Sequence, residues 1–148
     1  MTTHPYVRAY LAGIAVPTMF MLFVISAFVV ARFVFQVPIP IERALIFPMA
    51  LAPNLFGAWN MYYHRLHLSH TFSIGVHGAI LPLFMAPIGY EIATHLGFLQ
   101  LDPSGLVWFG ELRVSYALVA TGFCIALIIY YLVWKHFVNF FNDLLGIA

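Results

Sequence analysis

Long runs of apolar residues alternate with short polar clusters along this chain. Four of the runs are long enough to cross a bilayer, because a helix needs about 20 apolar residues to span about 30 Å of hydrocarbon. They occupy residues 9–36, 44–64, 71–96 and 112–136. Residues 137–148 follow, with polar side chains at helical spacing among apolar ones, which predicts an amphipathic C-terminal tail. The pattern predicts an all-α integral membrane protein, a single bundle of four transmembrane helices.

Prolines interrupt the second and third of these runs. Proline lacks a backbone donor, and its ring clashes with the preceding helical turn, so it kinks a helix that continues through it. We therefore expect the second and third helices to be kinked. The prolines are Pro48 and Pro53 in the second run and Pro82 and Pro87 in the third.

The connection between the third and fourth runs contains the clearest turn signal in the chain. Asp102-Pro103-Ser104-Gly105 combines residues that favour turns, each for its own backbone reason. The apolar segment 106–110 that follows is too short to cross a membrane. We expect it to lie in the membrane interface.

The composition agrees with a lipid environment. Of the 148 residues, 64% are hydrophobic and 7% are charged, with a mean hydropathy of +0.97. Soluble domains carry about 25% charged residues, so too few charges are present here to cover a water-exposed surface. The net charge of +1 provides no basic field for nucleic acid. The single cysteine, Cys124, excludes an intrachain disulfide.

Four crossings would place both termini on one side of the membrane, which we take to be a cell or inner membrane. The positive-inside rule does not orient the chain, because lysine and arginine divide three against three. Four of the five acidic residues lie opposite the termini, which favours cytoplasmic termini. The basic residues are Arg8, Arg65 and Lys135 on the terminal side and Arg32, Arg43 and Arg113 on the other.

A polar stripe runs along the second predicted helix. Gly57, Asn60 and His64 recur at helical spacing, and Asn54 lies deeper on the same helix. Polar side chains on a membrane helix turn toward the bundle or toward a wet cavity. The stripe is therefore either a set of interhelical hydrogen bonds, which contribute about 0.6 kcal/mol each, or the lining of a polar groove.

Histidines cluster at the end of the same helix. His64, His67 and His70 follow one another at intervals of three, and His77 lies about two turns into the third run. Neutral imidazole is a common ligand of transition metals and haem, so His77 with one of the three could hold haem, a chlorin pigment or a metal ion. The other interpretation is a hydrated interfacial cluster, with His77 donating to a carbonyl or to Asn60.

A second ionisable pair lies at the far end of the third run. Glu91 and His95 are four residues apart and therefore share one helix face. They could form a local ion pair or handle protons at the mouth of a polar groove.

Three functions are consistent with these patterns. The first is a non-catalytic subunit or assembly partner of a membrane complex, or a self-associating bundle, since the chain lacks a recognisable catalytic set. The second is a histidine-ligated haem, pigment or metal protein. The third is a small transporter that acts as a dimer, with Asn54, Gly57, Asn60 and His64 lining its path. The expected partners are the lipid bilayer and other membrane subunits or a second copy.

Overall fold

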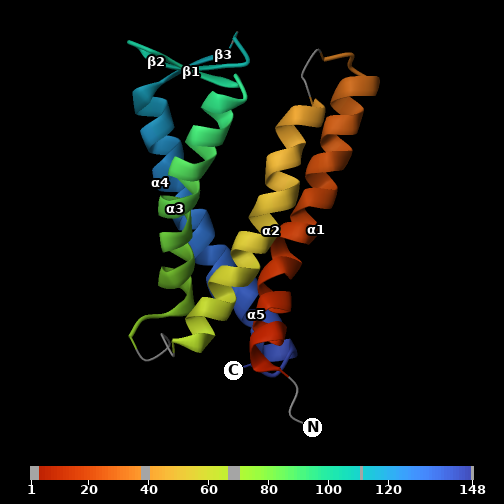
Figure 1. Ribbon diagram of the computed structural model, residues 1–148, viewed down its shortest axis with the longest axis vertical. Helices are drawn as coiled ribbons and strands as arrows, with labels where there is room; N and C mark the ends of the chain where they lie inside the picture. Colours follow the sequence, from red (N-terminus) through yellow and green to blue (C-terminus); the bar gives the residue numbers. More distant parts are fainter. Residues whose placement is uncertain (1–3, 38–40, 67–70, 111, 148) are drawn as a thin grey trace. The chain divides into compact units, whose positions relative to one another are not determined.

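The computed structural model (Figure 1) describes residues 4–37, 41–66, 71–110 and 112–147, with only the backbone described at 41–50. The chain is mostly helical and divides into two compact units. The first unit comprises Met1–Ile74 and Lys135–Ala148, and the second comprises Gly75–Trp134. We describe each unit by itself.

Three helices of the described chain are long and apolar enough to cross a membrane. They are α1 (Pro5–Phe33), α3 (Ile74–His95) and the helical stretch Tyr116–Leu144. These three helices are consistent with the expected membrane protein. The second predicted span also forms a helix, α2 (Ile41–Arg65), but α2 is not among the three. The four-helix bundle is therefore not confirmed.

The last helical stretch starts later than the sequence pattern predicted. It consists of α4 (Tyr116–Val133), a π-helical turn η2 (Trp134–Val138) and α5 (Asn139–Leu144). The predicted start at residue 112 is wrong, because residues 112–115 form a β-strand. Ser115 caps α4, its side chain accepting a hydrogen bond from the Leu118 amide at 3.3 Å. An N-cap of this kind satisfies a donor that the helix start leaves open.

In the first unit, α1 and α2 pack antiparallel, side by side (Figure 1), at very close range. A Cβ added to Gly13 of α1 would lie 2.5 Å from the Phe56 carbonyl oxygen and 2.8 Å from the Gly57 Cα. Small residues at a contact let helix backbones approach in this way. Ala9 and Ala12 extend the contact along α1, and both are fully buried.

In the second unit, a three-stranded antiparallel sheet connects α3 to α4. Its strands are β1 (Leu99–Asp102), β2 (Gly105–Trp108) and β3 (Leu112–Ser115), in the order β1-β2-β3. The predicted turn at 102–105 is present as the β1–β2 hairpin. The prediction of an all-α chain is wrong here, because residues 106–108 of the apolar segment 106–110 belong to β2. The expected position of this segment in the membrane interface stays a prediction.

Backbone geometry at Gly97 ends α3 and directs the chain into this sheet. Gly97 has φ +75°, a left-handed conformation that glycine adopts without a Cβ penalty. The Gly97 amide donates to Thr94 O and the Phe98 amide to Ala93 O, at 3.0 and 2.8 Å. These two bonds form a Schellman motif, which satisfies carbonyls that the helix end leaves free.

Candidate functional site

The predicted polar stripe of α2 leads to a buried amide cluster in the first unit. Asn60 is fully buried, and its Nδ2 donates to Ala9 O of α1 and to Asn142 Oδ1 of α5, both at 2.7 Å. Asn142 Nδ2 returns a bond to Asn60 Oδ1 at 3.2 Å. Because both Asn60 amide protons are used, its burial is compensated. The cluster joins α1, α2 and α5.

The other residues of the stripe also contact α1. Gly57 lies where an added Cβ would come within 2.7 Å of both Ile14 and Tyr10 side chains. Asn54, one turn earlier, accepts a hydrogen bond from the Tyr10 hydroxyl through Oδ1. Asn54 is nevertheless exposed overall. In the described chain, these two residues and Asn60 all lie at the α1–α2 contact.

The C-terminal end of the chain is tied to the start of α1 by a charged group. Arg8 Nη1 donates to the Leu145 carbonyl oxygen at 2.8 Å, just beyond the end of α5. A cation close to the last carbonyls of a helix interacts favourably with its dipole. With the Asn60–Asn142 pair, this bond places residues 8 and 145 at the same end of the first unit.

His77 lies in the core of the second unit. It is 1% exposed, and its ring meets the Trp134 indole edge-on, with centroids 5.7 Å apart at 77°. Gly78 is adjacent, and a Cβ there would clash with the Trp134 side chain. The Trp134 indole therefore occupies the space that Gly78 leaves open. The role of His77 as a ligand stays a prediction.

The remaining histidines of the predicted cluster are described in part. His64, at the end of α2, lies edge-on to Tyr63, with ring centroids 5.3 Å apart. Its Nε2 is buried without a hydrogen-bond partner among the residues that the structure describes. His67 and His70 lie outside those residues. In the described ranges, no group of three or more His, Cys, Asp and Glu is arranged to hold a metal ion.

Glu91 and His95 occupy the last turns of α3. Both are exposed, and their spacing of four residues places them on one face of the helix. Their pairing and any role in proton handling stay predictions.

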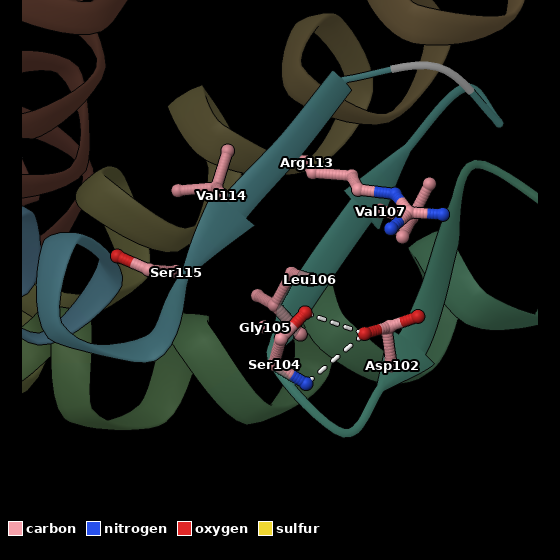
Figure 2. A pocket seen from close by; sticks show the side chains of 8 residues that line it. All are labelled: Asp102, Ser104, Gly105, Leu106, Val107, Arg113, Val114 and Ser115. Carbon is pink, nitrogen blue, oxygen red and sulfur yellow. Dashed lines mark hydrogen bonds between the residues drawn. The ribbon is translucent and has the colours of Figure 1, made fainter.

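A hollow of about 250 Å³ lies at the β1–β2 turn of the sheet (Figure 2), in a region for which we had predicted no site. Asp102 Oδ1 accepts hydrogen bonds from the Ser104 amide at 3.0 Å and the Ser104 hydroxyl at 2.6 Å. These two bonds, with a smaller contribution from the charge of Arg113, hold the pKa of Asp102 below its usual value. The hollow therefore carries a carboxylate and a guanidinium beside apolar lining residues, Leu106, Val107 and Val114.

Helix α4 presents an unpacked surface in the second unit. No residue of α4 is buried. Small side chains at helical spacing line one of its faces and are exposed: Ala117, Ala120, Thr121 and Cys124. We call these four residues the α4 small-residue face. Gly122 lies on a different face, and apart from its chain neighbours and the backbone of its own helix no atom in the described structure comes within 4 Å of a Cβ built there.

The fold and these sites define an apolar, mostly helical protein with three helices able to cross a membrane. Comparison with protein-family models, with curated proteins and with solved structures finds no match to this chain.

Proposed function

We propose that this chain is a non-catalytic subunit of a membrane complex, and that it assembles through the α4 small-residue face. The observation that carries this proposal is the contrast between α4 and α1. Three small residues of α1, Ala9, Ala12 and Gly13, are buried, and Gly13 lies against the backbone of α2. The small residues of α4 have the same spacing and none is buried.

The chemistry of such a face favours a helix as its partner. Apolar side chains gain little by leaving lipid for protein, so helices associate in membranes through close packing. Small residues permit that packing because they let two backbones approach. A Thr121 hydroxyl that donates to Ala117 O at 2.9 Å is already satisfied and adds no polar penalty.

We also propose that α2 is a fourth crossing. Arg8, at the start of α1, is bonded to Leu145, at the end of α5. Two residues in contact lie on the same side of a membrane, so the chain between them must cross an even number of times. The three helices of sufficient length and apolarity give an odd number. Antiparallel packing of α2 along α1 supports α2 as the crossing that makes the number even.

The lone cysteine supplies a direct test of assembly. Cys124 lies within the α4 small-residue face and is exposed. In native membranes treated with a thiol oxidant or a short bifunctional thiol reagent, we expect Cys124 to form a cross-linked product. The mass of that product distinguishes a second copy from another subunit. Cys124→Ser should abolish it.

A matched pair of variants controls for changes in lipid contact. Ala120→Leu places a bulky side chain on the α4 small-residue face and should dissociate the complex in mild detergent. Gly122→Leu adds an equally bulky side chain on another face and should leave the complex intact. A monomeric wild-type protein without a cross-linked product, or equal behaviour of the two variants, would refute assembly through this face.

The two alternative functions have less support in the described residues. A polar path along α2 would need free amide groups, and Asn60 uses both of its amide protons within the first unit. A cofactor at His77 would need space beside the imidazole, and Trp134 packs against it. A visible spectrum of protein purified from native membranes tests the cofactor alternative directly.

A further inference from the structure

The register of the β1-β2-β3 sheet separates its side chains by polarity. Paired residues on neighbouring strands share a face, and successive residues alternate between faces. The pairs Leu101↔Leu106 and Leu106↔Val114 fix one face, and Gln100↔Val107 and Val107↔Arg113 fix the other. The first face is wholly apolar, with Leu99, Leu101, Leu106, Trp108, Leu112 and Val114. The second carries Gln100, Asp102, Gly105, Val107, Arg113 and Ser115.

This apolar face is only partly covered by the protein. Leu99 is 3% exposed, whereas Leu101 and Leu112, on the two edge strands, are 62% and 61% exposed. Phe109, in the turn between β2 and β3, is also exposed. Large apolar side chains grouped on one face indicate contact with something other than water.

The connections of the sheet restrict where that contact can occur. Strand β1 begins four residues after α3 ends at His95, and β3 ends at the residue before α4 begins at Tyr116. Both helices belong to stretches able to cross a membrane. The Tyr116 hydroxyl also donates to the Asp102 carbonyl oxygen at 2.9 Å, which ties β1 to the start of α4. The sheet therefore lies where these helices leave the hydrocarbon.

The hydrogen bonding of the sheet limits its depth. A three-stranded open sheet has two edges, and within the described residues the outward backbone groups of β1 and β3 have no strand partner. Unpaired backbone groups are not tolerated in hydrocarbon, where no water can satisfy them. At the level of the lipid headgroups, water and polar lipid groups can form hydrogen bonds with these backbone groups. Tryptophan is enriched at this level, and β2 contains Trp108.

We propose that the apolar face of this sheet is a bilayer-docking surface. Its occupant is lipid, at the boundary between headgroups and acyl chains in the leaflet where α3 ends. The opposite face, with Asp102 and Arg113, is directed to headgroups and water. The sheet thus acts as an interfacial anchor between two transmembrane helices, independent of assembly through α4.

Spin labels placed on both faces test this arrangement. In a Cys124→Ala background, Leu101→Cys and Leu112→Cys report on the apolar face, and Gln100→Cys and Arg113→Cys report on the polar face. The protein is reconstituted into phosphatidylcholine vesicles, and collision of each label with oxygen and with a water-soluble nickel chelate is measured. We expect an oxygen-to-nickel ratio several-fold higher at Leu101 and Leu112 than at Gln100 and Arg113.

Two reference labels define the limits of the scale. Ser104→Cys, in the exposed turn, should give the oxygen-to-nickel ratio of a label in water. Ile125→Cys, exposed on α4, should give the ratio of a label in hydrocarbon. Values at Leu101 and Leu112 between these limits support the proposal. Nickel access equal to that of Ser104 would show a sheet in water, and exclusion of both reagents would show a protein covering this face. Either result overturns the proposal, whatever the outcome of the Cys124 cross-linking.

Discussion

At the residue scale, the stability of the first unit depends on polar groups buried without loss of hydrogen bonds. Asn60 is fully buried, yet each of its amide protons has an acceptor, one on α1 and one on α5. Burying an amide without partners is costly, whereas a satisfied pair is close to neutral and fixes the register of the elements that it joins. We therefore regard Asn60 and Asn142 as the pair that specifies how α5 docks.

Replacing one member of this pair should destabilise the first unit. Asn60→Leu leaves the buried Asn142 amide without its partner, and we expect a loss of about 1–2 kcal/mol in the free energy of unfolding. Asn60→Leu with Asn142→Leu should recover part of that loss, because no orphaned amide remains. Equilibrium unfolding in mixed micelles measures the double-mutant cycle. Strict additivity of the two single variants would contradict the pairing.

The inward orientation of Asn60 could be predicted from the sequence, whereas its partner could not. The helical spacing of Gly57, Asn60 and His64 indicated a common face, and polar side chains avoid lipid. Asn142 lies 82 residues further along the chain. A contact at that separation depends on the packing of whole helices, which no local pattern encodes. The turn at Asp102 was predictable because its hydrogen bonds are local.

At the element scale, the close contact between α1 and α2 depends on the absence of a side chain. Gly13 lets α1 approach the backbone of α2 at Phe56 and Gly57. Because the atoms that a Cβ would meet are backbone atoms, a rotamer change cannot relieve the overlap. The two helices would have to separate, and the packing of Ala9 and Ala12 would be lost with that movement.

Two Gly→Ala substitutions should therefore have opposite effects. Gly13→Ala is expected to lower the free energy of unfolding by about 1–3 kcal/mol, as overpacking does. Gly122→Ala has open space around its Cβ and replaces a poor helix former, so it should be neutral or stabilising by up to about 1 kcal/mol. Thermal denaturation of both variants in one detergent compares them. Equal losses would refute the close contact at Gly13.

The helices were predictable as elements, and the sheet was not. Long apolar runs identify α1, α3 and α4 because a bilayer imposes a minimum length. The strands are four residues each and lie between apolar helices, so the hydropathy pattern assigned residues 112–115 to the fourth span. The alternation Gln100-Leu101-Asp102 and Leu112-Arg113-Val114 was the available signal. Each alternation is too short to predict a strand unless the strand with which it pairs is known.

At the scale of the whole molecule, the chain forms two compact units from three stretches of sequence. The first unit contains both ends of the described chain, and the second contains the residues between them. Composition was sufficient to predict a membrane protein, because 7% charged residues cannot cover a soluble surface. The division into two units depends on contacts between distant residues and was not predicted.

The proposed even number of crossings gives a definite result for labelling from one side of the membrane. The two labels are placed in a Cys124→Ala background. Phe35→Cys reports on the residues just after α1, and Thr71→Cys on those just before α3; both positions are exposed. If α2 crosses, a membrane-impermeant maleimide added to sealed vesicles should label only one of them. Ser104→Cys should behave like Phe35→Cys. Labelling of Phe35→Cys and Thr71→Cys from the same side would refute a crossing by α2.

The pairing of Asn60 with Asn142 has a consequence for biosynthesis. Translation proceeds at about 5–20 residues per second, so the 82 residues between them take roughly 4–16 s to synthesise. During this interval the nascent chain contains the Asn60 side chain before Asn142 exists. The amide then needs a temporary partner, such as water, the insertion machinery or Ala9. A ribosome that stalls before codon 142 would leave the N-terminal helices without the Asn60–Asn142 hydrogen bonds.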